Sequence, residues 1–262
     1  MSATRVGIAT AWLLAALCVQ PAQAQSLFAL QSNANWQAEL RTQAAEAAER
    51  QEQAARAEGL LGCERYCGQL VSIFARLRST TQQQFPDGAG QAWQLVVTRR
   101  PAEEAWALPD GRVFISEAFI RRQGLQREEL AFALAHEIAH ITLAHEADTI
   151  DIVRRLTPFG IGSSVRDVYA ALDFDLGLLL RLSPMLEDME LEADQVGLML
   201  AALAGFDPDR AIGLLRKFAA EGERKAVVAT HPASARRLAA AEAVLPVARR
   251  LFERHRELAA QP

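Results

Sequence analysis

The chain has 262 residues, half of them hydrophobic, and a formal net charge of -4. This length suits one catalytic domain with an added segment, and two independent enzyme domains would be tight. The mild acidic charge and the ordinary share of charged residues are not typical of nucleic-acid binding, so we expect no nucleic-acid partner.

The first 24 residues have the features of an export signal. Arg5 supplies the positive start, residues 6–19 are apolar, and Ala22-Gln23-Ala24 has the small-x-small form of a signal peptidase site. The apolar run is shorter than the roughly 20 residues that cross a bilayer. We therefore expect cleavage after Ala24, a periplasmic location and no transmembrane span in the mature protein. An uncleaved membrane anchor is the alternative.

Export changes the interpretation of the three cysteines. Cys18 would be lost with the signal, which leaves Cys63 and Cys67 as a pair in an oxidising compartment. Residues four apart on a helix have Cα atoms about 6 Å apart, within the range of a disulfide. A disulfide and two buried thiols both remain open, whereas a zinc site from this pair lacks further ligands nearby.

Two helices are expected after the signal. Residues 33–61 are rich in Ala, Glu, Gln and Arg, which favours a helical N-terminal arm over about residues 25–60, either solvated or partly packed. A coiled coil is disfavoured because no clean apolar heptad runs through this segment. Residues 66–79 carry apolar side chains at three- and four-residue spacing, which predicts a helix with one core face. That face consists of Leu70, Ile73, Phe74 and Leu77.

Strands are expected only in the middle of the chain. Residues 80–90 are rich in turn formers and should end the second helix. Residues 93–98 and 112–116 have β-like composition, and Pro109-Asp110-Gly111 is a turn signal between them. We expect a small antiparallel sheet from these runs. From Arg127 onward the patterns are helical, so the fold class is α+β and mostly helical.

The stretch Leu172–Leu182 is the most hydrophobic part of the later chain. It contains Asp173, Asp175 and Arg181, so it cannot cross a membrane. A buried helix is the favoured interpretation, and a cover for the active site or peripheral contact with a membrane surface are the alternatives.

The most distinctive motif is Ala135-His136-Glu137-Ile138-Ala139-His140. Two histidines four residues apart lie about 40° apart around a helix, so both imidazoles can reach one metal ion. Glu137 lies on the flank of that face, where its carboxylate can take a proton from a water beside the metal without binding the metal. The motif therefore predicts two ligands and a general base.

A buried helix that happens to carry histidines is the alternative for this motif. Residues 130–143 are apolar nearly all round, so they would take His136, Glu137 and His140 out of water. That placement is costly unless a metal or polar partners satisfy the buried groups. On the same helix His145 would lie on the opposite face, so we expect it to be a surface or packing residue.

A catalytic zinc ion needs a third protein ligand. Glu190, Asp194 and Gly197 lie within about 60° of one another on a helix, whereas Glu192 points away. We expect Glu190 to bind the metal and Asp194 to accept a hydrogen bond from a ligand histidine. Gly197 would let this helix approach the metal helix closely. Taken alone, the acidic segment could equally be a solvated face.

The start of this acidic helix also has a sequence signal. Ser183 is a suitable N-cap, and Pro184 suits the first helical position, where its missing N–H costs nothing. We therefore expect the helix to begin at Ser183.

Several motifs resemble the metallopeptidase family that includes the CaaX prenyl protease and the HtpX proteases. The resemblance is closest to the soluble periplasmic members of the BepA and LoiP type. ELAFALAHEIAH resembles the family's metal helix, EDMELEADQVGLMLAALAGFDPDRA its second helix and following turn, and THPASARR its late His-Pro element. The match runs from about Cys63 to Arg237, with the motifs in the expected order.

The resemblance implies a gluzincin-type zinc endopeptidase with a mostly helical zincin fold. His136, His140 and Glu190 would bind one zinc ion per chain, with Glu137 as general base. Residues 61–262 would form the metallopeptidase domain. AWALPDGRVFIS is similar to a family strand whose edge would pair with an extended substrate. Glu104 departs from the family, which usually has Asn at this position.

His231 and Arg237 match the family's late His-Pro and the Arg six residues on. Either residue could stabilise the oxyanion of the tetrahedral intermediate. In relatives this histidine can instead approach the zinc and occupy its open position, which holds the enzyme inactive. The sequence does not choose between these roles.

The function expected from these patterns is zinc-dependent hydrolysis of peptide bonds in unfolded or misassembled envelope proteins. The substrates would be proteins and peptides of the cell envelope. A latched or non-proteolytic assembly factor with a structural zinc site is the alternative.

Overall fold

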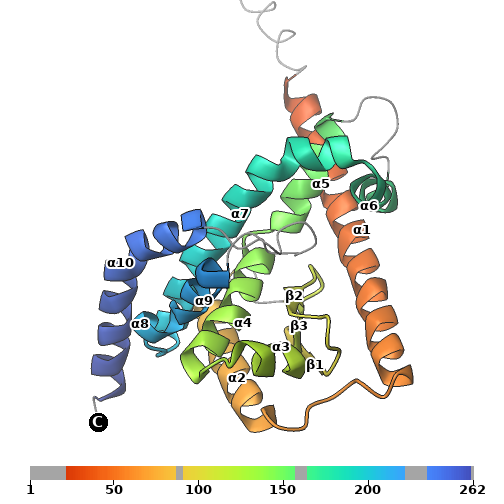
Figure 1. Cartoon of the computed structure of the whole chain (residues 1–262). Coiled ribbons are helices and arrows are strands. Elements are labelled where there is room, and N and C mark those ends of the chain that lie inside the picture. Colours follow the sequence, from red (N-terminus) through yellow and green to blue (C-terminus); the bar gives the residue numbers. More distant parts are fainter. Residues whose placement is uncertain (1–21, 87–90, 157–163, 222–234, 261–262) are drawn as a thin grey trace, which may run out of the picture.

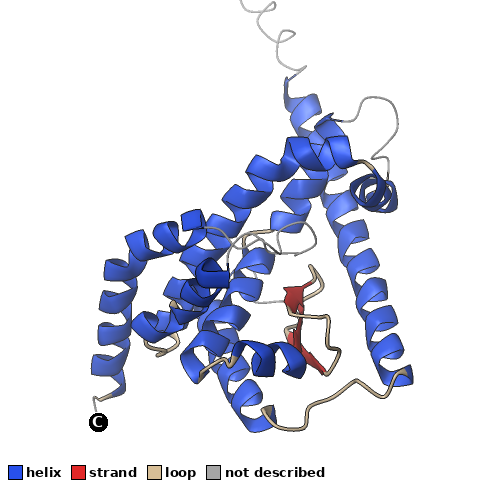
Figure 2. Ribbon diagram, in the orientation of Figure 1, coloured by secondary structure: helices blue, strands red, loops and turns tan. Residues whose placement is uncertain are grey.

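The structure is a computed structural model that describes residues 22–86, 91–156, 164–221 and 235–260. Helices dominate these residues, and the strands form one small sheet (Figure 2). The elements are α1 (Ala22–Ala57), α2 (Cys67–Gln84), β1 (Gln94–Thr98), β2 (Ala105–Ala107), β3 (Arg112–Ser116), α3 (Glu117–Gln123), α4 (Arg127–Thr142), α5 (His145–Leu156), α6 (Val165–Phe174), α7 (Leu176–Leu203), α8 (Pro208–Ala211), α9 (Gly213–Glu221) and α10 (Ala235–Ala259). The predicted class, α+β and mostly helical, is confirmed.

The sheet is mixed, so the expectation of an antiparallel sheet was wrong. The strand order is β1-β3-β2, with β1 parallel and β2 antiparallel to β3. The turn at Pro109-Asp110-Gly111 joins β2 to β3, and not β1 to β3. Because β2 takes the antiparallel position beside β3, β1 pairs with the other edge of β3 in the parallel sense.

Both faces of the sheet are covered. Leu95 and Val97 pack on the main core, and Val96 between them packs on the opposite side with Phe114 and Trp106. This alternation follows the two-residue period of a strand. The rings of Trp106 and Phe114 stack with centroids 3.8 Å apart.

α1 passes along the outer side of the sheet (Figure 1). Ala48 packs on Val96 and Phe114, while Trp36 and Leu40 pack among α5, α6 and α7. The predicted arm is thus one long helix with an inward stripe at four-residue spacing. The predicted signal peptide falls almost wholly on residues 1–21, outside the described residues, so it stays a prediction.

α2 carries the predicted core face, and all four of its apolar residues are buried. The helix runs further than expected, because residues 80–84 are helical and not a turn. Thr81 is buried and its hydroxyl donates to the carbonyl of Leu77 at 2.8 Å, which satisfies it within the helix. Pro86 follows the C-cap residue Phe85, as is usual for a residue that cannot continue a helix.

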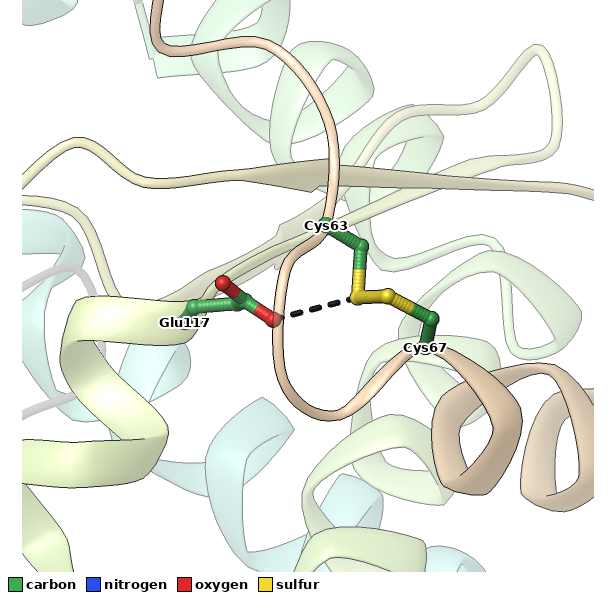
Figure 3. Close-up of side chains that lie close together, drawn as sticks. All are labelled: Cys63, Cys67 and Glu117. Carbon is green, nitrogen blue, oxygen red and sulfur yellow. Dashed lines mark hydrogen bonds between the residues drawn. A yellow bond between two sulfur atoms is a disulfide. The ribbon is translucent and has the colours of Figure 1, made fainter.

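Cys63 and Cys67 form a disulfide, with Cα atoms 5.5 Å apart. Cys63 lies in the loop before α2, and Cys67 is the first residue of that helix. The pair therefore does not lie on one helix, unlike the geometry considered from the sequence. One carboxylate oxygen of Glu117 accepts the backbone N–H groups of residues 64–66 at 2.8 to 3.1 Å. The same oxygen lies 3.1 Å from the Cys63 sulfur (Figure 3), which has no proton to donate in a disulfide. The amides therefore hold this carboxylate, and the disulfide closes the loop around it.

α7 begins earlier than expected, with Asp175 as its N-cap and Pro184 inside the helix. The side chain of Asp175 accepts the backbone N–H of Leu178 at 2.9 Å, so this residue starts the helix instead of Ser183. The apolar stretch 172–182 is consequently split between α6 and α7, and it is not one buried helix. Leu178 is buried, but Leu176 and Leu180 are 69% and 68% exposed.

α4 lies between α7 and the sheet, and α10 covers the other side of α7 (Figure 1). The main hydrophobic core fills the space between these helices and one face of the sheet. Within the four described ranges, no helix is both long enough and apolar enough to cross a membrane.

Candidate metal centre

α4 carries both predicted histidine ligands and the predicted base. It starts with a capping box, in which the backbone N–H of Gln126 donates to the Glu129 carboxylate at 2.8 Å. Every residue from 129 to 139 is buried, so the helix is surrounded by protein. His136 and Glu137 are 5% and 3% exposed. Such groups need polar partners or a metal to offset the loss of water.

Glu190 of α7 meets the two histidines of α4. Nε2 of His136 lies 3.1 Å from Nε2 of His140, and the Glu190 oxygens lie 3.5 Å and 3.3 Å from these two nitrogens. Tetrahedral zinc bonds of about 2.0 to 2.2 Å place neighbouring ligand atoms about 3.3 to 3.6 Å apart. The three side chains therefore fit one zinc ion, with the nitrogen and oxygen donors that zinc accepts.

Gly197 explains why the two helices approach so closely here. A Cβ at this position would lie 2.9 Å from the backbone nitrogen of His136 and 3.0 Å from its Cα. The predicted close approach is confirmed. The acidic face of α7 is thus held against the metal helix, and it is not solvated.

A buried ion pair lies behind His136. Oδ1 of Asp194 is 3.0 Å from Nδ1 of His136, the ring nitrogen opposite the ligand atom. Arg237 of α10 donates to both Asp194 oxygens at 2.7 and 2.8 Å and lies 2.9 Å from Glu190. This geometry orients the His136 ring and places the Arg237 guanidinium beside a ligand. Arg237 was considered as an oxyanion donor, and here its fork is occupied by the two acids.

The charges shift the pKa values of these groups. Burial alone would lower the pKa of His136, but its hydrogen bonds to the Asp194 and Glu190 carboxylates outweigh burial and raise the pKa to about 10. Burial would raise the pKa of Asp194, whereas Arg237 and His136 lower it. Without metal, His136 is therefore a cation between two carboxylates. Zinc needs the neutral imidazole, so its binding would release this proton.

A cavity opens beside the metal helix. It encloses about 370 Å³ of space, including solvent at its mouth, and His136, Glu137 and Arg237 line it. Glu104 and Ala105, at the start of β2, form another part of its wall. The remaining wall is mostly apolar and consists of Phe119, Phe132, Ala133, Asp194, Leu214, Leu215 and Phe218. The cavity brings the predicted base and one ligand next to the end of the edge strand.

Glu104 stands where the resembling family usually has Asn. Its carboxylate lies 3.6 Å from the Arg122 guanidinium, and its backbone carbonyl accepts the N–H of Ser116 at 2.9 Å. The backbone of Glu104 thus extends the pairing of β2 with β3. The side chain places an acid at the cavity wall.

His145 was expected on the opposite face of the metal helix, and this expectation was wrong. α4 ends at Thr142, and Ala144 adopts a positive φ of 59° before α5 starts. The chain therefore turns, and Nδ1 of His145 comes within 2.9 Å of Nδ1 of His140. His145 is buried, and its Nε2 lies 3.5 Å from the Glu192 carboxylate of α7. No Gly or Pro at the junction signals this break.

The predicted site residues thus fall into two groups. The structure brings together the following six: His136, Glu137, His140, Glu190, Asp194 and Arg237. His231 lies outside the described residues, so its role as a transition-state donor or a latch stays a prediction.

Comparisons with known proteins place the sequence in a family. The sequence profile of peptidase family M48 matches residues 67–245, which is more than half of the chain. The mitochondrial metalloendopeptidase OMA1 of Schizosaccharomyces pombe is 37% identical over 165 residues, covering 60% of this chain and 48% of the relative. Human OMA1 is 32% identical over 126 residues, which cover 44% of this chain and 24% of the relative. The β-barrel assembly-enhancing protease of Yersinia pestis is 29% identical over 126 residues, which cover 44% of this chain and 26% of the relative.

The histidine pair and the carboxylate, with a buried acid beside a cavity, form a site typical of metallopeptidases. The chain belongs to peptidase family M48. It spans about half or less of the length of the relatives given above. The narrower placement among soluble periplasmic members stays a prediction.

Proposed function

We propose that this protein is an exported zinc endopeptidase that cleaves unfolded or misassembled proteins of the cell envelope. The proposal rests on the convergence of His136, His140 and Glu190, whose ligand atoms lie within 4.8 Å of one another and so can bind one zinc ion. Glu137 lines the adjoining cavity. These side chains come from two helices, α4 and α7, and Glu190 follows His140 by 50 residues in the sequence.

The residues divide the chemistry between them. Zinc held by His136, His140 and Glu190 would supply Lewis acidity, which polarises a carbonyl and lowers the pKa of water. Glu137 takes a proton from the attacking water and later passes it to the leaving amine. The apolar wall of the cavity limits the access of bulk water, and low polarity strengthens these electrostatic interactions.

β2 offers a place for an extended substrate. It is an edge strand, and among the described residues only β3 pairs with it. Its first residue, Ala105, and the preceding Glu104 line the cavity that contains Glu137. A peptide that adds a strand to this edge would pass beside the predicted base. An unfolded chain can adopt this extended form, which favours unfolded substrates.

The envelope location rests on three observations. The N-terminal sequence has the pattern of a cleavable signal, and the disulfide is typical of an oxidising compartment. One relative is named for enhancing β-barrel assembly. The OMA1 relatives are named as mitochondrial, so membership of the family alone does not choose the compartment.

Glu137→Gln tests the mechanism. The amide keeps the size of the side chain but cannot take a proton, so we expect casein cleavage to fall by about 100-fold to 10,000-fold. Zinc should stay bound at about one ion per chain, because Glu137 is not a ligand. Glu128→Gln is the matched control, since Glu128 lies in the first turn of the same helix. This control should keep full activity.

Two outcomes would contradict the proposal. Cleavage by Glu137→Gln at the rate of the natural protein would exclude Glu137 as the base. A natural protein that binds zinc but cuts no unfolded substrate would favour the latched or non-proteolytic assembly factor. Metal analysis of each purified protein separates these cases.

A further inference from the structure

His140 has a second close contact on the side away from the metal position. Its Nε2 faces His136 and Glu190, while its Nδ1 lies 2.9 Å from Nδ1 of His145. The two rings are close to perpendicular, with centroids 4.9 Å apart. His145 therefore meets the ring nitrogen that zinc would not use. His145 is not among the three side chains that converge on the metal position.

The positions of the protons on the two rings determine which histidine donates in this contact. A histidine that binds zinc through Nε2 must carry its proton on Nδ1. In the contact with His145, Nδ1 of His140 is then the donor and Nδ1 of His145 the acceptor. The proton of His145 is then placed on Nε2, which lies 3.5 Å from the Glu192 carboxylate, beyond an ordinary hydrogen bond. The contact between the two histidines therefore has one consistent arrangement of protons.

The local backbone supports a specific arrangement at this point. His145 starts α5 directly after Ala144, an exposed non-glycine residue in the left-handed region. This conformation is sterically disfavoured for an L-residue other than Gly or Asn. The turn returns His145 to His140 and buries it to 5% exposure.

We infer that His145 is a positioning residue of the metal centre: it accepts the Nδ1 proton of His140, fixes its tautomer and ring orientation, and so strengthens zinc binding. The inference rests on the proposed zinc site. It assigns His140 a partner on α5, as Asp194 on α7 is the partner of His136. Partners of this kind typically contribute a factor of 10 to 100 in metal affinity.

Asn and Gln at position 145 test the inference directly. The side-chain oxygen of Asn can take the place of Nδ1 and accept from His140, whereas that of Gln extends toward the place of Nε2 and Glu192. We expect His145→Gln and His145→Leu to weaken zinc binding by about 10-fold to 100-fold. His145→Asn should stay within about threefold of the natural protein. His255→Leu, on the last turns of α10, is the control and should bind zinc normally.

The readout is the zinc dissociation constant, obtained by competition with a chromophoric chelator, together with thermal unfolding of each zinc-free protein. Equal affinity of the Asn and Gln variants would overturn the inference, because a packing role does not distinguish the two amides. Zinc binding by the Leu variant within twofold of the natural protein would also overturn it. If the natural protein holds zinc and the Asn–Gln difference is found, but no substrate is cut, only the proposed proteolysis fails.

Discussion

The two histidines of the metal centre are held in different ways. Behind His136 lies Asp194, which is fully buried and bonded to the buried Arg237. Behind His140 lies His145, whose outer neighbour Glu192 has a side chain that is 58% exposed. One side of the site is a buried charge network, and the other is a neutral contact that ends at the surface.

The two contacts should therefore contribute differently to folding and to zinc binding. The network behind His136 joins α4, α7 and α10, so its loss should affect folding as well as zinc binding. The contact behind His140 depends on the turn between two consecutive helices, α4 and α5. Its loss should affect zinc binding more than folding.

Asp194→Ala should have the largest effect on stability. Removing this acid takes away the carboxylate that pairs most closely with the buried Arg237, and breaking a buried pair typically costs about 3 to 5 kcal/mol. Glu192→Ala is the matched control, because it removes an acid two residues away on the same helix. An exposed acid contributes about 1 kcal/mol or less. Urea unfolding of the zinc-free proteins measures both.

A similar loss in both variants would remove the contrast between the two sides of the site. Zinc affinity adds a second criterion. It should fall in Asp194→Ala even where the protein is folded, because His136 loses the group that orients its ring.

Gly197→Ala should have the next largest effect. The added methyl would meet the backbone of His136 and push α7 away from α4, which typically costs about 1 to 3 kcal/mol. Zinc binding should weaken as well, since Glu190 lies on the displaced helix. Gly68→Ala is the control, because Gly68 is exposed in α2 with nothing within 4 Å of the added atom. Because Gly68 lies in the first turn of α2, the substitution should change the stability by no more than about 0.5 kcal/mol.

If Gly68→Ala were destabilised as much as Gly197→Ala, the loss of stability would not be specific to the contact between Gly197 and His136. An unchanged Gly197→Ala would mean that the two helices can separate without cost, contrary to the close packing at His136.

Helical periodicity made much of the site predictable. The angle of 100° per residue was enough to place His136 beside His140, and Glu190 beside Asp194 and Gly197. These groups do lie on the facing sides of α4 and α7. Their prediction needed no knowledge of the loops, because each set is contained in one helix.

The relations that the sequence did not reveal depend on breaks in the chain. His145 was assigned to the wrong face because the helix was assumed to continue, and the break falls at an alanine that carries no turn signal. The parallel pairing of β1 with β3 was missed because β2 has only three residues. Long-range pairings and unsignalled turns are set by tertiary packing, which overrides local propensity.

Ala144→Gly should have the smallest effect, and it tests the strained turn behind His140. Glycine adopts a positive φ without steric cost, so the substitution relieves strain in the folded state. Glycine also increases the entropy of the unfolded chain, which offsets part of the gain. We expect a stabilisation of up to about 1 kcal/mol, with zinc affinity unchanged because His145 keeps its contact.

Ala239→Gly is the matched control, since it changes an exposed alanine inside α10. In a helix interior this substitution should destabilise the protein by about 1 kcal/mol. Opposite signs for the two variants in urea unfolding would support a strained turn that holds His145 in place. Equal destabilisation would show that Ala144 stores no strain, and His145 would then be placed by packing alone.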